Sequence, residues 1–129
     1  MTYTVCDPID GWDWIAIDLD GTLADYRGHY DPYTIGDPIP VMAARVQGWR
    51  SQGEKLCIYT ARISEANDAR DLVRVKKAIQ DWCMKHLRCQ LPITCIKHHG
   101  IKAFYDDRAV QVEKNTGRLI GDPVVYAKS

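Results

Sequence analysis

The chain has 129 residues, a length that suits one domain with a single core over residues 1–129. Lys and Arg total 17, as do Asp and Glu, so the formal net charge is zero. The chain as a whole therefore does not attract the negative charge of nucleic acid or membranes, although a local basic patch is still possible. No run of 18 apolar residues occurs, the first ten residues lack the pattern of a secretory signal, and the five cysteines are irregularly spaced. These features predict a cytoplasmic protein with reduced thiols and no membrane partner.

A lead-in over residues 1–13 precedes a short apolar run, residues 14–18, which predicts a buried parallel strand. Asp18 and Asp20 follow at its carboxyl end, and side chains two residues apart on an extended chain point the same way. Two adjacent carboxylates repel each other, so they need a cation or a shared proton. Oxygen ligands at this spacing suit Mg²⁺, and Gly21 lets the chain leave the strand sharply. An ordinary turn is the alternative, because Asp and Gly are common in turns.

The run Asp18-Leu19-Asp20-Gly21-Thr22 resembles the first signature, DxDGT, of the haloacid dehalogenase superfamily. Members of this family are mostly Mg²⁺-dependent phosphatases. The resemblance implies that Asp18 is the nucleophile, which forms an aspartyl-phosphate intermediate, and that Asp20 is the general acid/base.

The next segment, residues 24–37, reads as an irregular loop because Asp, Gly and Pro interrupt any periodicity. Since it starts directly after the two carboxylates, we expect it to overhang the site. Aromatic rings can stack on bases and arginine can bind a phosphate, which makes five of its residues candidate substrate contacts. These residues are Tyr26, Arg27, His29, Tyr30 and Tyr33. The alternative is a surface loop whose tyrosines pack on the edge of the sheet.

A helix start is predicted at Asp37-Pro38, with Asp37 as the N-cap and Pro38 in the first position, and Gly53 ends this helix. A second buried strand is predicted over 55–59, followed by a long helix over 66–88. The apolar face of the long helix comprises Leu72, Val75, Ile79, Trp82 and Leu87. Its basic residues lie near another face, which favours a solvated surface over a role in nucleic-acid binding.

Further strands are predicted over 93–96 and 103–105, then a hairpin over 110–120 that turns at Asn115-Thr116-Gly117, and an edge strand over 124–126. Strands that alternate with helices predict an α/β fold, a three-layer Rossmann-like sheet of mostly parallel strands. A crossover between parallel neighbours needs a dozen or so residues, and far fewer separate the third and fourth strands. Either these two strands are not parallel neighbours, or the third lies outside the main sheet.

Phosphoryl transfer through an aspartyl intermediate needs a carboxylate nucleophile, an acid/base, a cation, and donors for the transferring oxygens. Thr60 ends the second strand, where its hydroxyl suits a phosphate oxygen, and Lys97 offers a mobile positive charge after the third. Asp106 and Asp107 end the fourth strand and complete a Mg²⁺ site with the first two carboxylates. Each has an ordinary alternative: a helix cap for Thr60, a surface position for Lys97 and a turn for the aspartate pair. Their order along the chain is that of the family.

Lys102 competes with Lys97 for the third signature. The short spacing from Lys97 to Asp106 resembles compact or capless family members and small deoxyribonucleotidases, which favours Lys97. Lys102 is expected to begin the fourth strand, at the wrong end of the sheet for catalysis. No interval between signatures holds a cap domain, so the expected site is open and suits a bulky substrate, or a second subunit of a homo-oligomer covers it.

The segments Thr60-Ala61-Arg62 and Asp106-Asp107-Arg108 resemble the 3′-phosphatase domain of phage polynucleotide kinase/phosphatases. That family places an arginine in the first loop, where this chain has His29 with Arg27 nearby, which argues against specificity for nucleic-acid ends. The candidate substrate-binding residues are Gly21, Thr22, Arg27, Ala61, Arg62 and Arg108. The sequence thus predicts a phosphomonoesterase for a phosphorylated small molecule. The alternatives are a nucleotide or nucleic-acid-end phosphatase and a non-catalytic phosphate-binding module.

Two other clusters contain residue types that bind ligands. Cys83, His86, Cys89 and Cys95 have spacings that match no standard zinc pattern, and Cys83 is needed on the apolar face of its helix. The pair His98-His99 either contacts substrate or caps a turn.

Overall fold

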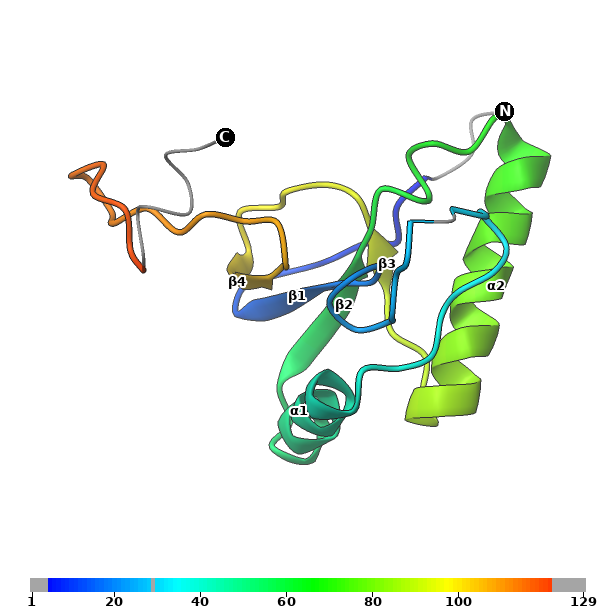
Figure 1. Cartoon of the computed structure of the whole chain (residues 1–129), viewed down its shortest axis with the longest axis horizontal. Coiled ribbons are helices and arrows are strands. Elements are labelled where there is room, and N and C mark those ends of the chain that lie inside the picture. Colours follow the sequence, from blue (N-terminus) through cyan, green and yellow to red (C-terminus); the bar gives the residue numbers. More distant parts are fainter. Residues whose placement is uncertain (1–4, 29, 122–129) are drawn as a thin grey trace.

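The computed structural model describes residues 5–28 and 30–121, and it confirms the predicted α/β class (Figure 1). The elements in chain order are β1 (Trp14–Asp18), α1 (Pro40–Ser51), β2 (Lys55–Tyr59), α2 (Ala69–Leu87), β3 (Ile93–Thr94) and β4 (Ile101–Tyr105). The predictions made for His29 and for a strand over 124–126 lie outside the described residues. No helix in the described ranges is long and apolar enough to cross a membrane.

The four strands form one parallel sheet in the order β3-β2-β1-β4. β1 therefore lies between β2 and β4, and Asp18 is directly opposite Tyr59 of β2. The carboxyl ends of these three strands meet at one edge of the sheet, which is where ligands bind in open α/β folds.

β3 and β4 lie at opposite edges of the sheet, so the first of the two alternatives for these strands is correct. Residues 95–100 join them. The two strands are not neighbours, so the crossover length that parallel neighbours require does not apply to the connection between them.

Both helices pack on one face of the sheet, where the alternating side chains Ile15 and Ile17 of β1 meet Val46 of α1 and Val75 of α2. The opposite face carries a smaller cluster. Its members are Ile9, Ala16, Cys57 and Ile101, with Trp14, Tyr59 and Phe104 packed against them. In the part of the chain that the structure describes, this second face is covered by no helix.

α1 begins at Pro40 with Ile39 as its N-cap, two residues later than the predicted start at Asp37-Pro38. The difference has a tertiary cause. The Asp25 N–H donates to the Asp37 carbonyl at 2.8 Å, and Pro38 pairs with Ala24 in an isolated bridge. These contacts hold residues 37–39 extended, so Pro40 takes the first helical position.

α2 begins at Ala69, and its N-cap is Asp68, whose side chain accepts the Asp71 N–H at 2.8 Å. All five residues of the predicted apolar face are buried. The helix ends as predicted within a residue, because Arg88 takes a left-handed conformation with a φ of 60°.

The predicted hairpin is present beyond β4. Val112 and Leu119 form an antiparallel bridge, and Glu113 N–H donates to the Arg118 carbonyl at 2.7 Å. The turn places Gly117 at a φ of 81°, where glycine carries no steric penalty. The hairpin extends away from the body of the domain (Figure 1).

Candidate functional site

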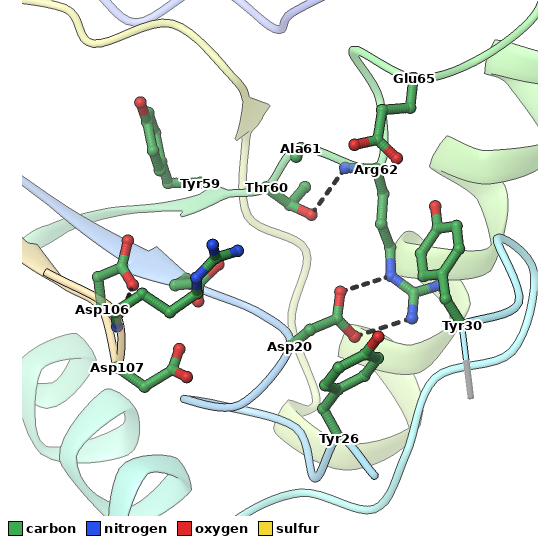
Figure 2. A pocket seen from close by; sticks show the side chains of 12 residues that line it. Asp20, Tyr26, Tyr30, Tyr59, Thr60, Ala61, Arg62, Glu65, Asp106 and Asp107 are labelled. Atoms are coloured by element: carbon green, nitrogen blue, oxygen red, sulfur yellow. Dashed lines mark hydrogen bonds and ion pairs between the residues drawn. The ribbon is translucent and has the colours of Figure 1, made fainter. Parts of the chain in front are cut away.

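A cavity of about 390 Å³ opens at the carboxyl end of the sheet, where the sequence predicted the site (Figure 2). Eight of the residues that line it belong to the predicted catalytic, metal and substrate-binding set: Asp18, Asp20, Thr60, Ala61, Arg62, Asp106, Asp107 and Arg108. Four others of that set, Gly21, Thr22, Arg27 and Lys97, do not line it.

Three carboxylates gather on one side of the cavity. Oxygen atoms of Asp18, Asp106 and Asp107 lie within 4.8 Å of one another. Burial, with the nearby carboxyls of Asp107 and Asp106, raises the pKa of Asp18 to about 7. Charges held this close favour a bound cation or a proton, and three carboxylate oxygens suit a hard divalent cation such as Mg²⁺.

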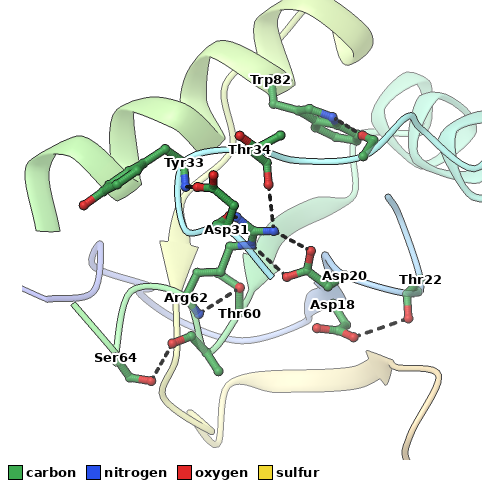
Figure 3. Close-up of polar contacts among 12 residues, drawn as sticks. Asp18, Asp20, Thr22, Asp31, Tyr33, Thr34, Thr60, Arg62, Ser64 and Trp82 are labelled. Atoms are coloured by element: carbon green, nitrogen blue, oxygen red, sulfur yellow. Dashed lines mark hydrogen bonds and ion pairs between the residues drawn. The ribbon is translucent and has the colours of Figure 1, made fainter. Parts of the chain in front are cut away.

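The turn after β1 positions Asp107. The Thr22 hydroxyl donates to Asp107 Oδ1 at 3.0 Å and accepts the Asp107 N–H at 2.9 Å. The same hydroxyl lies 3.5 Å from Asp18 Oδ2 (Figure 3). Gly21 has a φ of +87°, and a Cβ at this position would lie 2.6 Å from Asp107 Oδ2. Thr22 therefore holds Asp107 in place and Gly21 leaves room for the Asp107 carboxylate, and neither residue lines the cavity, where a substrate contact was expected.

Asp20 lies apart from the acidic cluster. Its two carboxylate oxygens accept hydrogen bonds from Nε and Nη2 of Arg62, both at 2.8 Å (Figures 2 and 3). This is a two-point ion pair, the strongest geometry available to a carboxylate and an arginine. The expectation that Asp20 completes the cation site through its side chain therefore does not hold in this arrangement.

Arg62 is only 3% exposed, and four of the five N–H groups of its guanidinium donate to protein groups. Besides Asp20, it donates to the backbone carbonyls of Asp31 at 2.9 Å and Thr34 at 3.1 Å, and it lies 5.0 Å from the centre of the Tyr30 ring. Arg62 thus ties the loop over 24–37 to the floor of the site. These bonds leave at most one N–H of Nη1 for the substrate contact expected for Arg62.

Thr60 is buried at the end of β2, with 2% of its surface exposed. Its N–H donates to the Thr94 carbonyl at 2.9 Å, and its hydroxyl oxygen accepts the Arg62 N–H at 3.2 Å. The hydroxyl proton finds no acceptor among the described residues. Thr60 does not cap α2, a role that belongs to Asp68.

Lys97 is exposed on the segment 95–100 and does not line the cavity. Lys102 is the second residue of β4 and pairs with Glu54 at 3.0 Å, at the opposite end of the sheet from the acidic cluster, as expected. Of the cavity-lining residues, Arg108 is therefore the exposed cation, because Arg62 is already paired.

The two histidines beside Lys97 make local contacts. His98 Nδ1 accepts the Gly100 N–H at 2.9 Å, and the His99 ring stacks on Trp12 with 5.1 Å between ring centres. Of the two roles considered for this pair, the turn cap is the one that the geometry supports.

The loop over 24–37 divides into two parts. Tyr26 and Tyr30 line the cavity, and each is 45% exposed. The Tyr33 hydroxyl instead donates to Asp71 of α2, and the Arg74 guanidinium lies 4.1 Å from the centre of its ring. Only the part of the loop that contains Tyr26 and Tyr30 therefore faces the cavity.

Arg27 makes an exposed ion pair with Asp25 at 2.8 Å and does not reach the cavity. Tyr59 and Glu65 also line the cavity, and neither was predicted to belong to the site. Tyr59 was detectable, because the last residue of a parallel strand next to β1 must end at the same edge as Asp18. Glu65 lies in the turn before α2, and no pattern in the sequence distinguishes it.

The chain matches no known protein family and no curated protein. A solved structure of a conserved protein from Bacteroides thetaiotaomicron is similar to it, with 19% sequence identity over 92% of this chain and 93% of that chain and a TM-score of 0.49. A likeness at this level carries no argument about the site.

Proposed function

We propose that the chain is a Mg²⁺-dependent phosphomonoesterase that acts through an aspartyl-phosphate on Asp18. The observation that carries this proposal is the acidic cluster. A half-buried carboxylate at the end of the central strand lies with Asp106 and Asp107 in a cavity that is open to solvent. Phosphoryl transfer needs this combination of a nucleophile and a charge-neutralising cation.

In the proposed reaction an Asp18 carboxylate oxygen attacks the phosphorus of a phosphate monoester. The new bond joins Asp18 to phosphorus, and the bond to the alcohol oxygen breaks, so the alcohol departs with the electron pair. Water then attacks the phosphorus, which releases inorganic phosphate and the free carboxylate. The Thr60 hydroxyl, which lines the cavity with an unused proton, is the proposed donor to a transferring oxygen.

Asp20 is the proposed acid/base, which protonates the departing alcohol and later accepts a proton from water. Both of its oxygens are bonded to Arg62 in this structure. Each of these oxygens keeps a second lone pair that can carry the proton, and Arg62 is proposed to position the carboxyl for both steps. This role replaces the substrate contact expected for Arg62.

Asp18, Asp106 and Asp107 would hold the Mg²⁺ ion. Their oxygens fit a hard cation, and the raised pKa of Asp18 is the consequence expected when burial and neighbouring carboxyls disfavour its charged form. Bound there, Mg²⁺ supplies positive charge next to the attacking oxygen and the transferring phosphoryl group. Thr22 supports this set through its two hydrogen bonds with Asp107, and Gly21 leaves the space that the Asp107 carboxylate occupies.

The resemblance of the first signature supports a further proposal, that the domain is a small member of the haloacid dehalogenase superfamily without a sizeable cap. The strand order supports it in one respect, because it brings the ends of β1, β2 and β4 together. The three-layer arrangement expected for such a fold is not seen in the described residues, because both helices pack on the same face of the sheet. Lys97 is proposed as its third-signature lysine and must move toward the cavity to act.

A nucleotide or a nucleic-acid 3′ end is the second candidate substrate class. The specific observation that favours it is the exposed pair of rings, Tyr26 and Tyr30, which line the same cavity as the exposed Arg108. Rings of this kind stack on bases, and an exposed arginine binds a phosphate. A phosphorylated small molecule that lacks a base would contact the acidic cluster but would gain nothing from stacking on the two rings.

The test is hydrolysis of an aryl phosphate, nucleoside monophosphates and 3′-phosphorylated oligonucleotides, with Mg²⁺ and with EDTA. We expect Mg²⁺-dependent release of phosphate, and we expect Asp18→Asn to abolish it while preserving the fold, because an amide is a poor nucleophile of almost the same shape. Binding of phosphate without turnover by the unaltered chain would instead identify the non-catalytic module.

A further inference from the structure

Two cysteine side chains from distant parts of the chain lie in direct contact. The Sγ atoms of Cys6, in the lead-in, and Cys95, directly after β3, are 3.0 Å apart. A disulfide bond requires about 2.05 Å between sulfur atoms, so a shift of roughly 1 Å separates this contact from a covalent bond. Neither thiol belongs to the acidic site or lines its cavity.

The contact is held in place by the residue that follows Cys6. The Asp7 N–H donates to the backbone carbonyl of Ile93 in β3 at 2.8 Å. The Ile93 N–H donates in turn to the Asp7 carboxylate at 2.8 Å. The same carboxylate also pairs with Lys76 of α2 at 2.7 Å. The lead-in is therefore fixed to β3 on one side of Cys6, which keeps the two thiols adjacent.

The two thiols differ in their surroundings. Burial raises the pKa of Cys6, but hydrogen bonds from the thiol and N–H of Cys95 and from Thr94 and Ile96 more than offset this effect, so the pKa of Cys6 is lowered. Burial and the neighbouring Cys6 raise the pKa of Cys95 to about 11. Cys6 accepts the Cys95 N–H at 3.1 Å, a bond that favours a thiolate, so Cys6 is better suited to act as the nucleophile and Cys95 as its partner thiol.

The other cysteines provide a comparison within the same chain. Cys57 and Cys83 are buried, and burial raises the pKa of each to about 12, which makes them poor nucleophiles. Cys89 is partly exposed, and burial raises its pKa too. Within the described ranges, the acidic cluster is the one group of three or more ligating side chains with closely spaced ligand atoms, so the two thiols lack the further ligands of a zinc site.

We propose that Cys6 and Cys95 form a redox-active pair that hydrogen peroxide converts to an intramolecular disulfide. The Cys6 thiolate attacks one peroxide oxygen and, with a proton, gives a sulfenic acid and water. The Cys95 sulfur then attacks the Cys6 sulfur, hydroxide leaves, and the proton from Cys95 converts it to water. In total, two thiols and one peroxide give one disulfide and two waters.

The disulfide joins the lead-in to the segment 95–100, which carries Lys97. Its two residues are 89 positions apart, so the bond closes a loop that contains β1, both helices and β2. A loop of this length removes much of the conformational freedom of the unfolded chain. Oxidation therefore stabilises the folded domain, whether or not the domain is a phosphatase.

The test starts from the reduced protein, which is exposed to hydrogen peroxide, alkylated and analysed by mass spectrometry. We expect the loss of two hydrogen atoms, a linked peptide that contains Cys6 and Cys95, and a midpoint of thermal unfolding at least about 5 °C higher. Cys6→Ser and Cys95→Ser should each lack the linked peptide and the shift. Cys89→Ser is the matched control and should retain both, and Asp7→Ala should slow disulfide formation by freeing the lead-in.

Three results would overturn the proposal. In the first, Cys6 and Cys95 both remain open to alkylation after oxidation. In the second, the linked peptide contains Cys89 in place of either residue. In the third, Cys6 is oxidised to the sulfinic acid without a disulfide, which would show that Cys95 does not reach it in time. None of these results depends on phosphatase activity, so the failure of this proposal and that of the proposed function are distinguishable.

Discussion

Arg62 and Asp20, 42 positions apart, form a two-point ion pair with both hydrogen bonds at 2.8 Å, and Arg62 is almost fully buried. The same guanidinium holds the carbonyls of Asp31 and Thr34. One side chain therefore joins the end of β2 to the turn after β1 and to the loop that overhangs the cavity. The shape of the site depends on this arginine as well as on the carboxylates.

Replacing Arg62 should affect both stability and activity. Arg62→Ala leaves Asp20 and two loop carbonyls without their donor, and removing one partner of a buried pair costs about 3 kcal/mol of unfolding free energy. Arg62→Lys keeps the charge but loses the second contact, so the loss should be smaller. Urea denaturation and phosphatase assays measure the two effects. Arg27→Ala is the matched control, because its exposed pair with Asp25 is worth almost nothing.

Asp20→Asn should slow turnover according to the leaving group. Proton transfer of this kind contributes about 10²–10⁴-fold, and a nitrophenolate needs little protonation, so phosphoenzyme formation on an aryl phosphate should suffer least. Pre-steady-state rates with aryl and alkyl phosphates compare the two cases. Equal losses on both substrates would remove Asp20 from the acid role and leave it as the partner of Arg62.

The stability of the domain should depend on pH through Asp18. Its pKa is about 7 in the folded state, above its value of 3.8 in the absence of these neighbours. Between these values the folded state binds more protons than the unfolded state, so without divalent cations the unfolding free energy should fall as the pH rises from about 4 to about 7. Added Mg²⁺ should reverse the fall. Thermal unfolding across this range, with and without Mg²⁺, tests both statements.

Asp107→Asn provides the control for that experiment. The variant removes one of the negative charges that face Asp18, so it should flatten the pH dependence in the absence of Mg²⁺. It should also weaken the stabilisation by Mg²⁺, because the cation loses a carboxylate. A variant that retains the full Mg²⁺ effect would place the cation elsewhere.

The two lysines that compete for the third-signature role, Lys97 and Lys102, should differ in importance. A donor aimed at developing charge in a shielded site is worth about 10²–10³ in rate, so Lys97→Ala should be severely impaired if the segment 95–100 brings Lys97 to the cavity. Lys102→Ala should be almost normal, because Lys102 pairs with Glu54 at the other end of the sheet. Single-turnover assays of both variants measure how much each lysine contributes to the rate of the chemical step. Normal activity in Lys97→Ala would mean that no lysine takes the third-signature role.

The tyrosines of the loop should separate substrate selection from structure. Tyr30→Ala removes a ring from the cavity, so kcat/KM for a nucleotide should fall while that for a minimal aryl phosphate changes little. Tyr33→Ala is the matched control, because that ring contacts α2. Equal effects of Tyr30→Ala on both substrates would show that the loop shapes the fold and does not bind the base.

Local patterns predicted the strands and the acidic cluster well. The apolar run before Asp18 specifies a buried strand, and parallel strands bring their carboxyl ends together, so the meeting of Asp18 with Asp106 and Asp107 follows from strand order alone. The start of α1 did not follow, since Asp37-Pro38 and Ile39-Pro40 are both plausible local starts. The pairing of Pro38 with Ala24 decides between them.

The sequence alone also did not predict which groups pair with the arginines. Arg27 and Arg62 are both residues that could bind a phosphate, and nothing near them in the chain indicates which is buried. Asp20 is far from Arg62 in sequence, and the pair forms only once β1 and β2 are side by side. Side-chain orientation in the irregular loop, where Tyr30 and Tyr33 face different ways, depends on the same tertiary contacts.

The strand order also determines when the domain can form during synthesis. The central strand β1 is made first, but its pairing with β4 joins Trp14 to Ile101, a separation of 101 − 14 = 87 residues. Contacts between such distant positions are slow to form, and β1 leaves the ribosome long before one of its two neighbours exists. The apolar face of β1 therefore depends on β2 and the helices for cover at this stage. The nascent chain gains its acidic cluster only after residue 107 has left the ribosome.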